Sequence, residues 1–213
     1  KKPHVISGTR GATKVVSVGG GFCALVGPSV RCWNQAQLVA GLPPRVVPRL
    51  KQPTALFGGR GEACARHADG LGCWSYATMF PRPPEGLKDV LGGGEVAHVA
   101  TGTDHTCAVD MQGRVICWGR NGAGQLGRSE GVEPPEEDEP EYANRKSRDT
   151  GAQLGAAVVM GLPKAKAVAL GHRHSCALSR GGQVHCWGGP GIMLGGGRVI
   201  TVSLQPLRVE GWP

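Results

Sequence analysis

The sequence predicts an all-β protein, a β-propeller built from four copies of one repeated hairpin. Cysteine occurs eight times, in four pairs, and a tryptophan directly follows the second cysteine of every pair. The first cysteines of the first three pairs, Cys23, Cys64 and Cys107, lie 41 and 43 residues apart. A period just above 40 residues in a β-rich chain is typical of propeller blades. Short apolar runs bounded by many of the 36 glycines and 16 prolines support the same fold class.

Each repeat is expected to contain three short core strands and one edge strand. In the third repeat the core strands fall at 96–102, 105–109 and 115–119, with turn residues between them. A fourth strand, marked by proline and valine, is expected to precede each hairpin, because proline suits a sheet edge. Its copies are placed at 3–6, 44–47, 156–160 and 206–209, with a poor copy at 86–91. Residues 1–213 are thus expected to form one repeat domain, with repeats at approximately 3–43, 44–84, 85–127 and 155–205.

The interval between the third and fourth cysteine pairs is longer than the others. Cys107 and Cys176 lie 69 residues apart, and residues 128–150 are expected to form an acidic, mobile insertion loop. Residues 130–141 hold seven of the 16 acidic residues, which leaves 24 basic and nine acidic residues elsewhere, a net charge of +15. That excess would attract an anionic partner, although net charge also serves solubility. The insertion itself is either solvated, folded back on the basic face, or a calcium ligand without the usual loop pattern.

The two cysteines of each repeat are expected to form a disulfide. They lie 9 or 10 residues apart around a turn, so folding the hairpin about its centre places them opposite each other, about 4.5–5.5 Å apart at Cα and within disulfide reach. The predicted pairs are Cys23–Cys32, Cys64–Cys73, Cys107–Cys117 and Cys176–Cys186. The alternative is eight buried thiols. Disulfides favour an extracytoplasmic location, whether secreted, periplasmic or at the cell surface.

The tryptophans that follow these pairs are expected to pack between neighbouring blades. Adjacent residues of a strand point to opposite faces of the sheet, so each tryptophan should point away from its own disulfide. The four residues are Trp33, Trp74, Trp118 and Trp187.

The third repeat carries a resemblance to a known family. It reads His-Thr-Cys-Ala-Val at 105–109 and Gly-Arg-Val-Ile-Cys-Trp-Gly-Arg-Asn-Gly-Ala-Gly-Gln-Leu-Gly at 113–127. This pattern resembles the repeats of the regulator of chromosome condensation propeller family, in particular its cysteine-containing bacterial members. The fourth repeat matches through Gly188, and the first two keep only the Cys…Cys-Trp skeleton. Family members are typically seven-bladed, so the resemblance implies a fragment, an arc or a subunit of a larger propeller, with a four-bladed ring as the alternative.

Groups that could carry chemistry are few. His105 and His174 each lie two residues before a cysteine, but a compact Cys/His quartet at zinc-site spacing is lacking. We therefore expect each imidazole to donate to a neighbouring backbone carbonyl. The sequence contains no Gly-x-Ser-x-Gly elbow, no His-Glu-x-x-His and no phosphate loop. These observations predict no cofactor, no bound metal and no enzymatic activity.

A non-enzymatic protein-binding module is the function that the sequence favours. The second repeat departs most from the pattern and offers aromatic and arginine side chains of the hot-spot type. The predicted partner-binding residues are Arg60, Tyr76, Met79, Phe80 and Arg82. Two alternatives follow from the resemblance: nucleic-acid or polyanion binding through a basic face, as in chromatin-associated members, and inhibition of an enzyme, as in a propeller that blocks β-lactamases. No run of 18 apolar residues predicts a transmembrane segment.

Overall fold

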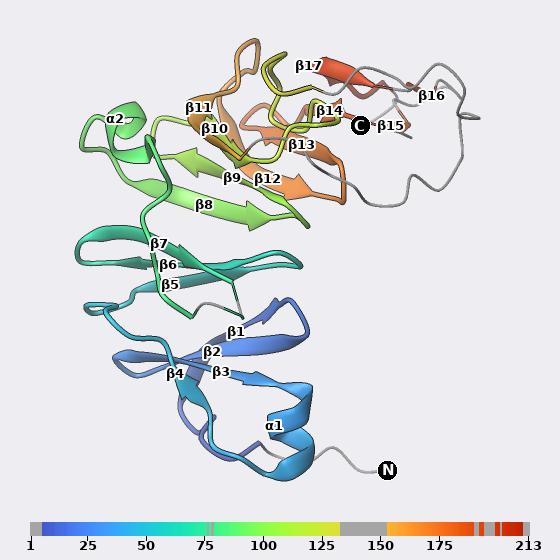
Figure 1. Cartoon of the computed structure of the whole chain (residues 1–213). Helices are drawn as coiled ribbons and strands as arrows, with labels where there is room; N and C mark the ends of the chain where they lie inside the picture. The colour runs from blue at the N-terminus through green and yellow to red at the C-terminus, as the bar shows by residue number, and fades with distance from the viewer. Residues whose placement is uncertain are drawn as a thin grey trace.

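The computed structural model shows a stack of four antiparallel sheets, which we call blades 1 to 4 (Figure 1). Blade 1 consists of β1 (Ala12–Val18), β2 (Gly21–Val26), β3 (Ser29–Asn34) and β4 (Arg45–Val46), and blade 2 of β5 (Ala55–Gly58), β6 (Ala63–His67) and β7 (Gly70–Trp74). Blade 3 consists of β8 (Val96–Thr101), β9 (His105–Asp110), β10 (Val115–Gly119) and β11 (Leu154–Val158), and blade 4 of β12 (Ala165–Leu170), β13 (His174–Ser179), β14 (Val184–Gly188) and β17 (Ser203–Arg208). The structure describes residues 6–75, 77, 79–132, 153–189, 192–193, 199–200 and 202–210.

Three smaller elements lie between or beside these strands. Helix α1 (Gln35–Ala40) joins β3 to β4, and α2 (Leu87–Leu91) precedes blade 3. The two-stranded hairpin of β15 (Ile192–Met193) and β16 (Val199–Ile200) lies in the chain between β14 and β17. No helix among the described residues is long and apolar enough to cross a membrane.

The edge strand of each blade follows its hairpin, which corrects the predicted repeat boundaries. Strands β4, β11 and β17 pair with the third strand of the preceding hairpin instead of opening the next blade. The residue after each of them donates its N–H to the third strand in the same way, as Val47 to Val30, Val159 to Val115 and Val209 to Val184, at 2.8–2.9 Å. The copy at 206–209 is thus the completing strand of blade 4. Chain order alone does not decide which of two neighbouring hairpins an edge strand joins.

Two other predicted edge strands also differ. The poor copy at 86–91 is largely helix α2, between the left-handed glycines Gly86 and Gly92. Blade 2 is completed instead by a single bridge in which Cys73 and Arg82 exchange backbone hydrogen bonds of 2.9 Å. The predicted copy at 3–6 lies almost wholly outside the described residues.

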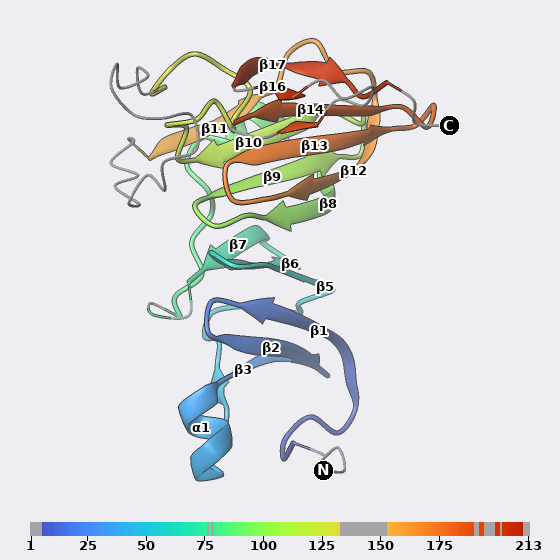
Figure 2. The ribbon, with the colours of Figure 1, turned by 90° about the vertical axis from the view of Figure 1, so that its right-hand side faces the viewer.

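The blades follow one another as an open arc. The first strands of successive blades lie side by side, β1 against β5, β5 against β8 and β8 against β12. Figures 1 and 2 place blade 1 at one end of the molecule and blade 4 at the other. Among the described residues, the arc therefore has two end faces in addition to its three junctions between blades.

Each hairpin carries the disulfide expected from its spacing. The four cysteine pairs are directly opposed in the strand register, and their Cα atoms lie 4.0 or 4.1 Å apart. None of the eight cysteines is free. The bonds run within a blade, so they reinforce hairpins and do not link one blade to the next.

Each of the three junctions between blades has its own apolar cluster, and the three clusters share one arrangement. At each junction, the disulfide of one blade packs in the same apolar cluster as the tryptophan of the next blade. The clusters contain Cys23 and Cys32 with Trp74, Cys64 and Cys73 with Trp118, and Cys107 and Cys117 with Trp187. Because neighbouring residues of a strand alternate between faces, the disulfide of the earlier blade faces the tryptophan of the later blade at each of the three junctions.

Trp33 departs from this arrangement. Blade 1 has no blade before it among the described residues, and Trp33 packs in a cluster with its own blade and the segment before β1. It is 1% exposed, stacked against Phe22 with ring centroids 5.0 Å apart. The prediction of inter-blade packing thus does not describe Trp33, whose partners come from its own blade and residues 6–12.

Candidate partner-binding site

A polar connection joins blades 3 and 4 beside the apolar cluster. The Nε2 atom of His105 lies 2.9 Å from the Oγ atom of Ser175, and Ser175 donates its proton to the backbone oxygen of Gln125 at 2.8 Å. The serine hydroxyl has only one proton, so we assign His105 as the donor through Nε2–H. The indole N–H of Trp187 donates to the same Gln125 oxygen at 2.9 Å. The imidazole, hydroxyl and indole thus meet at one loop carbonyl.

The junction between blades 2 and 3 repeats this connection with a carboxylate. Glu62 precedes its cysteine by two positions, as His105 does in the next blade. Thr106 takes the place of Ser175 and donates to Oε1 of Glu62 at 2.5 Å. Glu62 and the two hydroxyls were not predicted from the sequence. Aligning the repeats at their first cysteine places Glu62 at the position of His105, and Thr106 at the position of Ser175.

Burial shifts the two titratable groups in opposite directions. Loss of hydration raises the pKa of Glu62, and hydrogen bonds from Thr106 and Trp118 oppose that rise. Loss of hydration lowers the pKa of His105 to about 4, helped by the nearby imidazoles of His174 and His172. Each group is therefore held toward its neutral form in the folded protein.

The turn at 121–127 supplies the carbonyl that blade 4 uses. The side chain of Asn121 accepts from the Leu126 N–H at 2.8 Å and donates to the backbone oxygens of Arg128 and Glu130 at 2.8 and 2.6 Å. Asn121 is fully buried, so these bonds fix the turn and with it the carbonyl of Gln125. The Asn-x-x-x-Gln-Leu-Gly motif is therefore a structural connector between blades.

The turns between the first two strands of each blade form a continuous rim, which we call the turn ridge. It comprises residues 19–20, 59–62, 102–104 and 171–173. Successive turns are bonded, by Gly19 N–H to Arg60 O at 3.1 Å, Gly61 N–H to Gly102 O at 2.8 Å, and His172 Nδ1 with Thr103 Oγ1 at 3.0 Å. A Cβ atom on Gly102 would lie 2.8 Å from Cε1 of His105. Only glycine allows the ridge to run this close to the buried imidazole.

The charged side chains of the turn ridge differ in exposure. Arg60 is exposed and Arg173 is half-buried, whereas the two acidic residues are Asp104, which is half-buried, and Glu62, which accepts a hydrogen bond from Thr106 across the junction. The ridge presents these groups on turns that the inter-turn bonds hold in place. Its chemistry suits an anionic group more than a cationic one.

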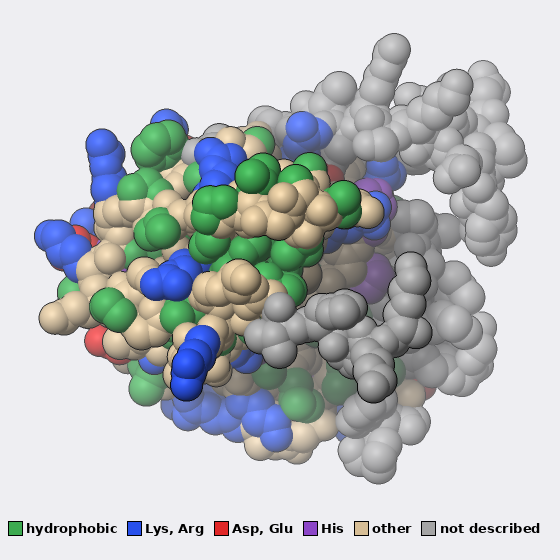
Figure 3. Space-filling view, turned by 90° about the horizontal axis from the view of Figure 1, so that it is seen from below, with side chains coloured by type: hydrophobic (Ala, Val, Ile, Leu, Met, Phe, Trp, Pro, Cys, Tyr) green, Lys and Arg blue, Asp and Glu red, His purple; other side chains and the backbone are tan. Residues whose placement is uncertain are grey.

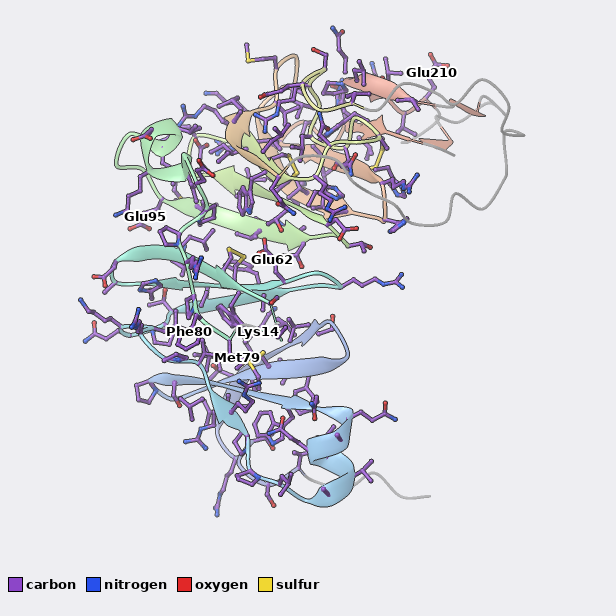
Figure 4. The ribbon with its side chains drawn as sticks, in the orientation of Figure 1. Lys14, Glu62, Met79, Phe80, Glu95 and Glu210 are labelled. Atoms are coloured by element: carbon purple, nitrogen blue, oxygen red, sulfur yellow. A yellow bond between two sulfur atoms is a disulfide. The ribbon has the colours of Figure 1, made fainter. Side chains whose placement is uncertain are left out.

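The predicted partner-binding residues are not all exposed. Arg60 lies on the turn ridge, and Phe80 is 55% exposed. Arg82 is exposed and completes blade 2 through its backbone. Met79 is a correction, because it is 3% exposed and packs in the cluster between blades 1 and 2 (Figure 4). Tyr76 lies outside the described residues.

An exposed apolar surface lies instead on blade 1, and we call it the blade 1 patch. Helix α1 is well formed, with a capping box between Asn34 and Gln37 and the left-handed Gly41 at its end, yet it buries no side chain. The patch comprises Leu38, Val39, Leu42 and Val46, which are 38%, 83%, 55% and 58% exposed. Figure 3 looks onto this end of the molecule and shows hydrophobic side chains bordered by lysine and arginine.

One group among the described residues has metal-ligand spacing. It consists of Glu62, Cys64 and Cys73, whose ligand atoms lie within 4.8 Å of one another. The two sulfurs are bonded to each other, so a disulfide occupies the positions of two thiolate ligands. The predicted insertion at 128–150 lies outside the described residues from 133 onward.

The stack of blades and its repeated junctions define a β-propeller repeat protein. The model of the regulator of chromosome condensation (RCC1) repeat matches residues 96–125 and 165–191, which belong to blades 3 and 4. Blades 3 and 4 therefore contain RCC1-type repeats, as the resemblance implied.

Solved structures show the same fold. Yeast RCC1 (Prp20), in a structure bound to Kap60, superposes with a TM-score of 0.65 at 18% identity, covering 93% of this chain and 48% of that chain. Human WBSCR16 superposes with a TM-score of 0.58 at 19% identity, covering 93% of this chain and 52% of that chain. The chain thus spans about half the length of either structure.

Two curated relatives match in sequence. Alsin of Mus musculus is 32% identical over 137 residues, which is 63% of this chain and 7% of alsin. Protein pim1 of Schizosaccharomyces pombe is 31% identical over 102 residues, which is 48% of this chain and 18% of pim1. The match covers only a small part of either relative.

Proposed function

We propose that the chain is a non-enzymatic, extracytoplasmic protein-binding module whose partner contacts the blade 1 patch. The observation that carries this proposal is helix α1, which is capped at both ends but buries none of its side chains. A helix of six residues draws little stability from propensity alone and depends on packing. Its apolar residues Leu38 and Val39 are exposed, as are Leu42 and Val46 of the chain that follows, and exposed apolar side chains of this kind are typical of interaction sites.

The border of the patch indicates the chemistry of the partner. Arg31 pairs with Val46 in the strand register, and Arg45 directly precedes it. Lysine and arginine also surround the apolar area in Figure 3. We expect a protein segment with an apolar stripe flanked by aspartate or glutamate, because complementary charge guides and orients such an encounter.

The proposed location has independent support from the disulfides. Four intra-blade bonds use all eight cysteines, and structural disulfides persist in oxidising compartments. Non-reducing mass spectrometry of the chain isolated from its source, with thiols alkylated before lysis, should find four disulfides. Free thiols in that sample would place the chain in a reducing compartment.

Selection of displayed peptides tests the binding surface. A random peptide library selected on the oxidised full chain should yield sequences rich in apolar and acidic residues. The double variant Val39→Asp, Leu42→Asp should weaken their binding at least tenfold, which is about 1.4 kcal/mol. Met160→Asp is the matched control, since Met160 is 75% exposed and follows β11 in blade 3. Equal loss in both variants, or no loss in either, would rule out the patch.

Polyanion binding is a second candidate, favoured by Arg60 and Arg173 on the turn ridge. A fluorescein-labelled 20-nucleotide single strand should then bind with an affinity that falls steeply with salt. The double variant Arg60→Glu, Arg173→Glu should abolish that binding. Lys51→Glu is the control, because Lys51 already pairs with Asp69 at 3.0 Å away from the ridge. Absence of binding by the unmodified chain at low salt would discard this candidate.

A further inference from the structure

Blade 2 has an arginine at a position that is apolar in the other three blades. The position lies two residues after the first cysteine of each repeat. It is Arg66 in blade 2, and in the other blades it is Leu25, Val109 or Leu178. Arg66 shares a strand face with Cys64, which packs in one apolar cluster with Trp118 of blade 3. The guanidinium of Arg66 is therefore directed at the junction between blades 2 and 3.

This guanidinium has hydrogen-bond partners, but both are neutral. Its Nε atom donates to Oγ1 of Thr54 at 3.3 Å, and Nη1 donates to the backbone oxygen of Val96 at 3.1 Å. Among the described residues, the ion pairs do not include Arg66. The side chain is half-buried, and a cation that is partly removed from water is stabilised by a counter-charge.

A cavity of about 470 Å³ lies beside Arg66, between blades 2 and 3. Its walls come from the turn between β6 and β7 in blade 2, and from α2 and the start of β8 on the side of blade 3. The apolar lining residues are Ala68, Leu71, Pro83, Leu87, Leu91 and Val96. Small-molecule sites have volumes of about 300–1,000 Å³. Blades 2 and 3 each have a neighbour on both sides (Figure 1), so the open ends of the arc do not create this cavity.

The junction between blades 3 and 4 shows how the same space is closed elsewhere. There the backbone oxygen of Gly113, in the turn after β9, accepts the N–H of Ala165 at 2.8 Å. A Cβ atom on Gly113 would lie 3.0 Å from the oxygen of Ala165. In blade 2, a Cβ atom on the turn residue Gly70 would meet no atom within 4 Å. The side chain of Arg66, instead of a turn carbonyl, reaches the start of β8, and the space between turn and strand stays open.

Helix α2 forms its wall of the cavity without help from a ligand. The backbone oxygen of Glu85, just before the helix, accepts the N–H of Ala156 at 2.7 Å. The guanidinium of Arg114 donates to the backbone oxygen of Val90 at 3.2 Å. Leu87 of the helix is 3% exposed and packs in the cluster between blades 2 and 3. The wall is thus fixed to blade 3, as in a preformed site.

The charged groups around the cavity leave a positive excess. Asp69 is already paired with Lys51 at 3.0 Å. Of the other charged lining residues, Arg66 and Lys88 are cations and Glu95 is an anion (Figure 4). Within the part of the chain that the structure describes, the ion pairs include none of these three. Two cations against one carboxylate favour a ligand with a single negative charge.

We propose that this cavity binds a small organic acid, with one carboxylate on an apolar body. The carboxylate lies between Arg66 and Lys88 and accepts charge-assisted hydrogen bonds from them. The apolar body packs on Leu71, Leu87 and Leu91. The site is separate from the blade 1 patch and from the turn ridge, so it does not depend on the protein-binding function proposed above.

Three probes with the same apolar body test the choice of charge. They are 4-phenylbutanoate, 4-phenylbutan-1-ol and 4-phenylbutylammonium, each titrated into the oxidised full chain. Backbone amide shifts of residues 67–71 and 93–96 in NMR spectra report binding in the cavity. The carboxylate should bind about tenfold more tightly than the alcohol, and the ammonium should bind most weakly. Equal affinities, tighter binding of the ammonium, or no shift with millimolar carboxylate would each overturn the proposal.

Matched variants test the two cations. Arg66→Leu introduces the residue type of the other blades and should remove the preference for the carboxylate over the alcohol. Lys88→Gln changes an exposed side chain, so it should preserve the fold while weakening carboxylate binding several-fold. Lys166→Gln is the control, since Lys166 is exposed on β12 in blade 4 and does not line the cavity. Equal weakening by Lys88→Gln and Lys166→Gln would overturn the site, because net charge alone would then explain binding.

One further variant separates this proposal from the proposed function. The chain with Val39→Asp and Leu42→Asp, which tests the blade 1 patch, should bind 4-phenylbutanoate with unchanged affinity. Loss of probe binding in that variant would contradict a site between blades 2 and 3.

Discussion

The junctions between blades 2 and 3 and between blades 3 and 4 have one geometry but opposite titration chemistry. Each joins a group two residues before a cysteine to a hydroxyl of the next blade, Glu62 to Thr106 and His105 to Ser175. Burial raises the pKa of the carboxyl and lowers that of the imidazole. The comparison shows that this repeat position holds a group that can be buried in its neutral form. A glutamate is neutral at low pH and a histidine at high pH, so burial acts on their pKa values in opposite directions.

The largest expected effect comes from removing the tryptophan of either junction. Trp187→Ala and Trp118→Ala should each lower the free energy of unfolding by about 3–5 kcal/mol, because a large buried ring is replaced by a cavity. Trp187 is 0% and Trp118 8% exposed, so the loss should be greater at Trp187. Denaturant unfolding under non-reducing conditions measures both. Trp→Phe at the same positions is the control, and equal losses for Phe and Ala would show that ring volume is not the cause.

The second prediction concerns the loss of stability at acidic pH. Burial lowers the pKa of His105 to about 4 in the folded chain, below the ordinary histidine value of 6.5, so its neutral form favours folding. This stability is present above about pH 6.5 and is lost as pH falls through 4. The total loss is at most about 3 kcal/mol, at 1.36 kcal/mol per pKa unit. Unfolding followed at several pH values should show this slope in the unmodified chain and lose most of it in His105→Gln.

The third prediction concerns Glu62, whose contribution to stability changes with pH in the opposite direction to that of His105. Burial raises the folded pKa of Glu62 above the ordinary glutamate value of 4.5, so its stabilising contribution is present below about pH 4.5 and is lost as pH rises through the folded pKa. Glu62→Gln should therefore stabilise the chain at pH 8, by about 0.5–2 kcal/mol. Thermal unfolding at pH 4 and pH 8 compares the two chains. A variant that is less stable than the unmodified chain at pH 8 would contradict the stated direction.

The last prediction separates the two hydroxyls. Ser175→Ala removes one neutral hydrogen bond and should cost about 1 kcal/mol at pH 8. Thr106→Val removes a donor to a carboxylate, which is worth about 1.5–3 kcal/mol when the acceptor is charged. The cost of Thr106→Val should consequently rise with pH, whereas that of Ser175→Ala should not rise between pH 7 and pH 9. Parallel unfolding measurements on both variants would show whether only one junction contains a charged acceptor.

The hairpins could be predicted from the sequence because their information is local. Two cysteines around a short turn specify their own register, as the opposed pairs Cys23 with Cys32 and Cys107 with Cys117 show. The alternation of cysteine and tryptophan between faces likewise follows from the two-residue period of a strand. The candidate surface was harder, because helix α1 and its exposed Val39 carry no repeat pattern. Met79 was misplaced because nothing nearby in sequence shows that its side chain turns into a core between two blades.

The sequence by itself determined the four stapled hairpins, their turns and the residue that each places on either face. Tertiary structure alone decided which hairpin each edge strand completes, which groups meet across a junction and which faces stay open. The physical reason is the range of the interactions. Register within a hairpin is set by residues a few positions apart, whereas the bond between His105 and Ser175 joins residues 70 positions apart and depends on how whole blades stack. Strand β13 of blade 4 reflects that stacking, since the residues that face blade 3 are buried while His174, Cys176 and Leu178 between them are only partly buried.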